Sequence, residues 1–108
     1  MDYSQIKFDS NGLIPAIIQD ADTGQVLMLG WMNHLALEKT LKTGLITFWS
    51  RSRNKIWTKG ETSGNFLSLK GTFIDCDQAA FLFMAKPAGP TCHTGNISCF
   101  FTEIVPKN

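Results

Sequence analysis

Residues 12–32 read GLIPAIIQDADTGQVLMLGWM, and this stretch decides the fold. Two apolar runs, Gly12 to Asp20 and Gln25 to Met32, are joined by a short polar segment that ends in Gly24. Apolar runs of this length, bounded by turn residues, are typical of strands, and a polar segment closed by glycine is typical of a tight connection. The stretch therefore predicts a β-hairpin near the start of the fold.

One helix is expected directly after the hairpin. Asn33 can cap a helix that runs to about Lys42, because an Asn side chain accepts a hydrogen bond from a free N–H of the first turn. Leu37 and Leu41 then share one face, and Gly44 supplies the left-handed residue at which many helices end. This is the one segment whose sequence clearly predicts a helix.

The rest of the chain predicts strands separated by turns. Strands are expected where β-branched, aromatic and alternating apolar residues gather, and turns where glycine and proline cluster. With no alternation of strands and helices, the pattern predicts a mainly β fold with one helix, an α+β single domain over residues 1–108. The further expected strands are Leu45 to Trp49, Ile56 to Trp57, Phe66 to Asp77, Ala80 to Ala85 and Ser98 to Val105.

Size and charge limit the classes of function. Ten Lys and Arg against nine Asp and Glu give a formal net charge of +1, which argues against a general nucleic-acid or membrane-surface binder. A chain of 108 residues builds a thin core, which a metal or a partner chain would help to stabilise. No apolar run is long enough for a membrane span and the first residues do not resemble a signal peptide, so a cytoplasmic location is expected.

The clearest chemical cluster lies in the last third of the chain. It holds all three cysteines, Cys76, Cys92 and Cys99, with Asp75 and Asp77 beside the first. Three thiolates in a reducing compartment point to zinc, and three protein ligands leave a position for a water that zinc can convert to hydroxide. The cysteines therefore predict a catalytic zinc site.

Two other interpretations of the cysteines stay open. His93 could supply a fourth ligand of a closed structural site, although it directly follows Cys92 and neighbours in an extended segment point to opposite sides. Any single cysteine is also more often an ordinary core residue than a ligand. The aspartates close to Cys76 favour the metal.

Asp75 and Asp77 form a second candidate metal site. If the segment from Ile74 to Ala79 is extended, Asp75, Asp77 and Ala79 project from one side and Cys76 from the other. Such carboxylates attract magnesium, which usually keeps several waters and also binds phosphate oxygens of a substrate. The alternative is a solvated strand end.

A basic segment followed by a glycine-containing loop is a candidate phosphate site. Arginine side chains and exposed backbone N–H groups bind phosphate esters, and Trp49 or Trp57 could stack on a base. The alternative is a solvated basic loop whose tryptophans belong to the core. The residues are Arg51, Arg53, Lys55, Lys59, Glu61, Thr62, Ser63 and Gly64.

Four stretches, in this order, resemble one family, the phosphoribosyl-AMP cyclohydrolases of histidine biosynthesis. They read GLIPAIIQDADTGQVLMLGWMN, FWSRSRNKIWTKGETSGN, DCDQA and GPTCHTGNISCF, and they span about Gly12 to Phe100. The resemblance implies a zinc- and magnesium-dependent hydrolase that opens the adenine ring of phosphoribosyl-AMP between N1 and C6. It also implies an intertwined homodimer with active sites at the interface.

The resemblance also assigns the metal ligands. The zinc ligands of the family match Cys76, Cys92 and Cys99, and two of its three magnesium aspartates match Asp75 and Asp77. The family motif is DCDxD, and its last position is Ala79 in this chain. Two rival functions remain. One is a nucleotide-binding protein that has lost turnover, and Ala79 is the only reason to consider it. The other is a small structural module stabilised by zinc.

The remaining roles concern substrate. His93 is the candidate catalytic residue, because a histidine beside a ligand but pointing elsewhere can move a proton to or from the ring nitrogen. Arg51, Arg53, Lys59 and the loop from Glu61 to Gly64 would hold the ribose phosphates. In some organisms a phosphoribosyl-ATP pyrophosphohydrolase domain follows this domain, and a chain that ends near Lys107 leaves that arrangement open.

Overall fold

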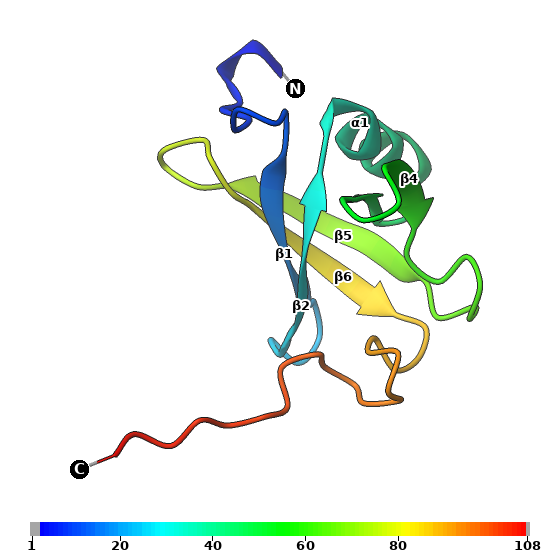
Figure 1. The fold of residues 1–108 in the computed structure, drawn as a ribbon. Helices are drawn as coiled ribbons and strands as arrows, with labels where there is room; N and C mark the ends of the chain where they lie inside the picture. The colour runs from blue at the N-terminus through cyan, green and yellow to red at the C-terminus, as the bar shows by residue number, and fades with distance from the viewer. Residues whose placement is uncertain (1–2, 108) are drawn as a thin grey trace.

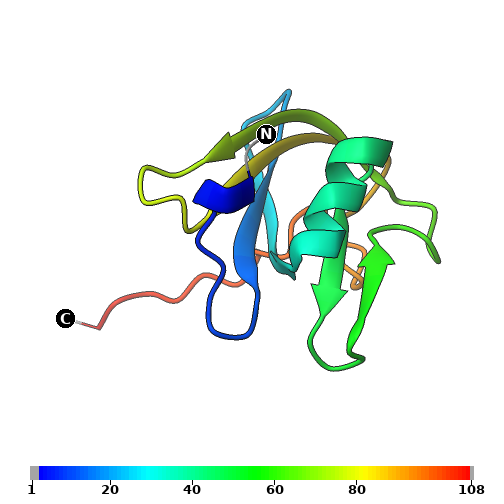
Figure 2. The same ribbon diagram turned by 90° about the horizontal axis from the view of Figure 1, so that it is seen from above.

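The computed structural model describes residues 3–107, which form two β-sheets and one α-helix (Figures 1 and 2). One sheet has four strands in the order β2-β1-β6-β5, and the other pairs β3 with β4. The predicted α+β class is confirmed. The elements are a 3₁₀ turn (Tyr3–Gln5), β1 (Ile14–Asp20), β2 (Val26–Met32), α1 (His34–Thr43), β3 (Thr47–Ser50), β4 (Lys55–Thr58), β5 (Leu67–Ile74) and β6 (Phe81–Pro87).

The predicted hairpin is confirmed. β1 and β2 pair antiparallel, with Ile14 opposite Met32. At the turn, the Asp20 carboxylate accepts hydrogen bonds from the backbone N–H of Asp22 at 2.8 Å and of Thr23 at 3.2 Å. These bonds satisfy backbone donors that no strand partner reaches, so they hold the connection closed.

The predicted helix is confirmed as well. The Asn33 side chain accepts a hydrogen bond from the N–H of Ala36 at 2.9 Å, and Gly44 ends the helix with φ 75°. Thr40 lies on the inner face, where its hydroxyl donates to the carbonyl of Ala36 and accepts from the N–H of Thr47. This buried hydroxyl fixes α1 to the first residue of β3. No helix within residues 3–107 is long and apolar enough to cross a membrane.

β1 lies in the middle of the larger sheet and organises the core. It pairs antiparallel with β2 and parallel with β6. Ile14, Ala16 and Ile18 alternate with less buried residues, so one face of β1 is covered. Phe81 and Phe83 of β6 are buried and stacked in the same core, with ring centroids 5.2 Å apart.

The predicted extension of β5 to Asp77 is wrong. β5 ends at Ile74, and the next residues turn, with φ 57° at Gln78 and a hydrogen bond from its N–H to the carbonyl of Asp75 at 2.9 Å. A segment that turns does not send alternate side chains to opposite sides. Asp75, Asp77 and Ala79 therefore do not lie along one side of a strand, contrary to the prediction.

The predicted last strand, Ser98 to Val105, is also wrong. The Cys99 N–H donates to the carbonyl of Leu27 at 2.8 Å, but residues 100–107 form no element and run away from the body of the molecule (Figure 1). A strand needs a neighbour that accepts its backbone hydrogen bonds. The described part of one chain offers this segment no such neighbour.

Candidate active-site cavity

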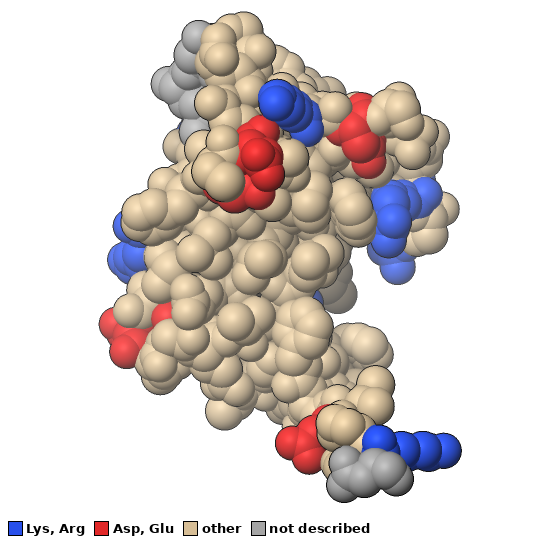
Figure 3. All heavy atoms as spheres, turned by 90° about the vertical axis from the view of Figure 1, so that its left-hand side faces the viewer, with Lys and Arg blue, Asp and Glu red and all other residues tan. Residues whose placement is uncertain are grey.

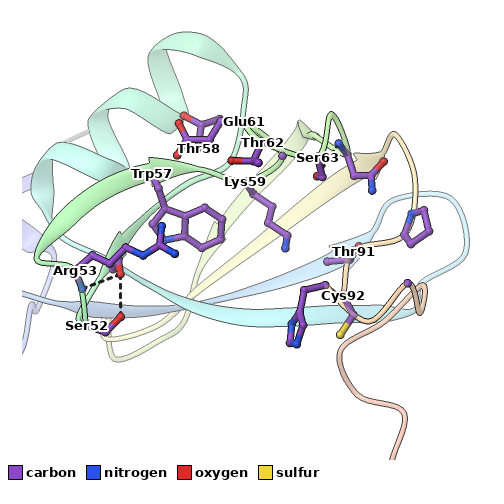
Figure 4. Close-up of a pocket in the computed structure, with 16 residues that line it drawn as sticks. Ser52, Arg53, Trp57, Thr58, Lys59, Glu61, Thr62, Ser63, Thr91 and Cys92 are labelled. Atoms are coloured by element: carbon purple, nitrogen blue, oxygen red, sulfur yellow. Dashed lines mark hydrogen bonds between the residues drawn. The ribbon is translucent and has the colours of Figure 1, made fainter.

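A cavity of about 680 Å³ opens between the loop after β4 and the loop after β6 (Figure 4). The first loop and the end of the β3–β4 hairpin contribute polar and basic side chains, and the second contributes a thiol and an imidazole. The predicted residues that line the cavity are Arg53, Lys59, Glu61, Thr62, Ser63, Cys92 and His93. Gly64 belongs to the first loop but does not line the cavity.

The loop after β4 folds back on itself because of Gly60. Its φ is 94°, and a Cβ placed there would lie 2.5 Å from the backbone nitrogen of Phe66. Glycine is therefore required at this position. The carbonyl of Gly60 accepts a hydrogen bond from the N–H of Gly64 at 2.7 Å, which closes the loop beside the cavity.

Lys59 and Trp57 form one wall of the cavity. The Lys59 ammonium lies 5.6 Å from the centre of a Trp57 ring, within the range of a cation–π contact. Figure 4 shows the Lys59 side chain directed towards Thr91 and Cys92. A cation thus lies beside a flat aromatic surface, an arrangement suited to a ligand that carries both an anionic group and a ring.

Cys92 lies in a tight turn on the opposite wall. The N–H of Cys92 donates to the carbonyl of Asn96 at 3.1 Å, and the N–H of Gly95 donates to the carbonyl of Cys92 at 3.0 Å. The Thr94 hydroxyl donates to the Cys92 sulfur at 3.1 Å, and this hydrogen bond lowers the pKa of the Cys92 thiol. The positive charge of Lys59 lowers that pKa further, by a smaller amount.

Cys99 accompanies Cys92. Burial raises the pKa of the Cys99 thiol, and the neighbouring Cys92 raises it further. The two thiols are close enough to interact, and within this pair the pKa of Cys92 is lowered and that of Cys99 is raised. The chain therefore brings two of its three predicted zinc ligands together.

The third predicted ligand lies elsewhere. Cys76 is in the β5–β6 turn, whereas Cys92 follows the opposite end of the same hairpin, where Leu67 pairs with Pro87. The length of β5 separates the two regions by roughly 20 Å. Accordingly, residues 3–107 of a single chain contain no group of three or more His, Cys, Asp or Glu that could hold a metal ion.

The magnesium candidates also lie in the β5–β6 turn. Asp75 and Asp77 are exposed, and Asp75 Oδ1 accepts hydrogen bonds from the N–H of Ala79 at 2.8 Å and of Ala80 at 3.3 Å. Asp75 thus shapes the turn through one carboxylate oxygen. Ala79 takes part through its backbone.

Arg51 occupies a different surface from Arg53. Its guanidinium carbon lies 4.8 Å from the centre of a Trp31 ring, in a second cavity of about 580 Å³ that Trp49 also lines. Residues 51–54 form the turn of the β3–β4 hairpin, and Asn54 has a φ of 57°. The two arginines therefore point into separate cavities.

Thr91 was not among the residues predicted for the site. Its hydroxyl is buried, and among the described residues it has no hydrogen-bond partner, although Thr91 lines the larger cavity. A buried polar atom almost always has a partner, so this hydroxyl indicates room for a water or a bound group. One threonine beside a proline carries no sequence signal for such a role.

Known proteins match this chain over most of its length. Residues 28–101 match the family model described as phosphoribosyl-AMP cyclohydrolase. The chain is 59% identical over 97 residues to the histidine biosynthesis bifunctional protein HisIE of Photobacterium profundum, covering 90% of this chain and 47% of that protein. It is 53% identical over 100 residues to the phosphoribosyl-AMP cyclohydrolase of Hydrogenovibrio crunogenus, covering 93% of this chain and 68% of that protein. For the phosphoribosyl-AMP cyclohydrolase of Roseobacter denitrificans, the identity is 50% over 103 residues, with 95% and 80% covered. The chain thus spans about half the length of the bifunctional relatives it matches.

Proposed function

Because this chain belongs to the phosphoribosyl-AMP cyclohydrolase family, we propose that it hydrolyses the adenine ring of phosphoribosyl-AMP between N1 and C6 in histidine biosynthesis. The observation that carries the proposal is that Arg53, Lys59, Cys92 and His93 line the same cavity. Its volume of about 680 Å³ falls in the usual range for small-molecule sites. The cytoplasmic location stays a prediction.

The side chains around the cavity would have different roles in binding and converting the substrate. Arg53 and Lys59 would bind phosphate oxygens, since a charged donor forms a stronger hydrogen bond to an anion than a neutral one does. Trp57 offers a flat surface for the purine. His93 would move a proton to or from the ring nitrogen as the ring opens. Arg51, on the other surface, would reach a phosphate only from the second cavity.

Zinc fits the pair of thiols formed by Cys92 on the cavity wall and its neighbour Cys99. Cys92 already accepts a hydrogen bond that favours its thiolate form, and Cys99 lies beside it. The unpartnered hydroxyl of Thr91 indicates space for a further group close by. Bound zinc would supply the Lewis acidity that activates water. Cys92 and Cys99 would hold it, with Cys76 as the third ligand.

A homodimer would deliver that third ligand. Cys76 lies too far from Cys92 within one chain, so in this proposal Cys76 belongs to a second copy. The end of the chain supports such an assembly, because Ile97, Phe100, Phe101, Ile104 and Val105 are each at least 54% exposed. Figure 3 shows a broad face of the molecule that carries few charges. Exposed apolar side chains such as those of Phe100 and Phe101 are typical of protein interfaces.

Magnesium would bind at the β5–β6 turn. Asp75 and Asp77 supply two exposed carboxylates, and magnesium is often held by only one or two carboxylates together with substrate phosphate. In the proposed dimer this turn approaches the cavity of the other copy. Asp75 and Asp77 would hold the ion there, and its charge would favour binding of a substrate phosphate.

Turnover of phosphoribosyl-AMP by the purified chain, with metal analysis of the same sample, tests the function. We expect ring opening that depends on both metals. Nucleotide binding without ring opening would favour the rival that has lost turnover. Tightly held zinc without nucleotide binding would favour a structural module.

Co-expression of two inactive variants tests whether the zinc ligands come from two copies. Cys76→Ser and Cys92→Ser should each abolish zinc binding and turnover, because a hydroxyl replaces thiolate poorly. In a heterodimer of the two variants, one of the two zinc sites keeps all three cysteines and the other loses two. Random pairing should therefore restore about a quarter of the wild-type activity. If soluble heterodimers formed but showed no turnover, the proposal that two copies share the zinc ligands would be contradicted.

A further inference from the structure

Two hydrogen bonds in series end on the Cys92 sulfur. The Asn96 side-chain amide donates from Nδ2 to the Thr94 hydroxyl at 2.9 Å, and the Thr94 hydroxyl donates to Cys92 Sγ at 3.1 Å. The backbone bonds between Cys92 and Asn96 and from Gly95 to Cys92 hold these side chains in one turn. The series runs from exposed Asn96 to the buried sulfur.

The direction of the two bonds follows from the donors available. Asn96 Nδ2 can only donate, so the Thr94 oxygen is the acceptor in the first bond. The single hydroxyl hydrogen of Thr94 is then free for the sulfur. A thiolate accepts such a bond without giving up a hydrogen of its own, so the arrangement suits a thiolate, free or metal-bound.

We propose that Asn96 and Thr94 form a relay that orients the Cys92 thiolate and sets how tightly the centre holds its metal. The inference rests on the proposed zinc site. Thr94 is a positioning residue, since it acts through Cys92 and does not itself line the cavity. Neither hydrogen bond of the relay reaches Cys99. Cys99 would therefore bind a metal that the oriented Cys92 sulfur already holds.

The test measures zinc affinity by competition with a chromophoric chelator. Thr94→Val keeps the shape of the side chain and removes the donor, and loss of a hydrogen bond to a metal ligand typically weakens binding 10- to 100-fold. We expect zinc affinity to fall by about that factor. Thr94→Ser restores the hydroxyl and should stay within about threefold of the wild type.

A second variant reverses the relay. Asn96→Asp replaces a donor with an acceptor, which would draw the Thr94 hydrogen away from the sulfur. Zinc affinity should then fall, whereas simple attraction between the added carboxylate and the cation would raise it. The variant therefore separates the relay from general electrostatics.

A matched control is available on α1. The Thr43 hydroxyl donates to the carbonyl of Lys39 at 2.8 Å, so Thr43→Val removes a similar bond from a different element. Its zinc affinity should equal that of the wild type. The melting temperature of each metal-free variant shows whether the fold is retained.

Two results would overturn the relay: zinc affinity unchanged in Thr94→Val, or equal loss in Thr94→Val and Thr94→Ser. Cobalt gives an independent readout, because the thiolate-to-cobalt absorption band should shift in Thr94→Val and return in Thr94→Ser. A wild-type chain that binds neither metal would instead overturn the zinc centre itself. The wild-type measurement therefore distinguishes failure of the proposed function from failure of the relay.

Discussion

Arg53 and Arg51 are two positions apart in the sequence but line different cavities. Arg53→Ala removes the proposed charge-assisted contact, worth about 1.5 to 3 kcal/mol, which corresponds to a fall of roughly 10- to 150-fold in kcat/KM for phosphoribosyl-AMP. Steady-state kinetics check this value. Lys39→Ala removes an exposed cation from α1 and should leave kcat/KM unchanged. Equal kcat/KM values in the two variants would show that the loop that carries Arg53 is a solvated turn without a role in substrate binding.

Ala79 stands in the β5–β6 turn, at the position where the family resemblance implies an aspartate. Ala79→Asp adds a third carboxylate to a turn that already carries Asp75 and Asp77, so magnesium binding should tighten. Turnover should then saturate at a lower magnesium concentration, while zinc content stays the same. Titration of activity against magnesium compares the two forms. Identical, active curves would show that two aspartates suffice, and no turnover in either form would favour a nucleotide-binding protein.

Residue types indicated which side chains to consider for the site, but not how they are arranged. Cys92, His93 and Lys59 were identifiable because thiolates, imidazoles and ammonium groups have few common roles. Their shared cavity depends on how two distant loops approach, and the sequence does not encode that locally. The separation of Cys76 from Cys92 and the unpartnered hydroxyl of Thr91 likewise appear only in three dimensions.

Among the elements, β1, β2 and α1 were predictable because neighbouring residues determine them. The hairpin depends on Asp20 and Gly24, and the helix on Asn33 and Gly44. The parallel pairing of β1 with β6 was not predictable, since a hydrophobic pattern does not specify a distant partner. The end of β5 was misplaced because Gln78 adopts a φ of 57°, which its residue type does not announce.

The β1–β2 turn should make stability depend on pH. Hydrogen bonds from the backbone N–H groups of Asp22 and Thr23 lower the pKa of Asp20 below its usual 3.8. A carboxyl whose pKa is lower in the folded state stabilises the fold above its unfolded pKa, and this contribution is lost as the pH falls through the folded pKa. Asp20→Ala should therefore unfold at lower urea concentration than the wild type at pH 7.

The difference between Asp20→Ala and the wild type should shrink as the pH falls below 3.8. Asp20→Asn keeps an acceptor for the turn and should lose less stability at pH 7 than the alanine variant. Urea unfolding across this pH range measures both variants. A difference from the wild type that stays constant into acid would show that the charge of Asp20 does not contribute.

For the molecule as a whole, the expectation is that assembly and stability are coupled. A thin core and an exposed apolar chain end predict a melting temperature that rises with protein concentration, as mass action requires of a dimer. The double variant Phe100→Ser and Phe101→Ser should dissociate in sedimentation velocity experiments and lose this concentration dependence. Leu35→Ser changes an exposed apolar residue of α1 and should remain dimeric. A monomeric wild type with a constant melting temperature would contradict the proposed assembly.

The parallel pairing of β1 with β6 also determines when the sheet can form during synthesis. β1 ends at Asp20, and its central partner begins only at Phe81. At typical translation rates of 5 to 20 residues per second, about 3 to 12 s pass between them. During that interval β1 can pair only with β2 in this sheet, and Ile14 and Ile18 lack the cover of Phe81 and Phe83. The central strand of the nascent chain therefore stays only partly covered until most of the protein has been made. Chaperones would bind the exposed strand during this interval, and faster translation would shorten the interval.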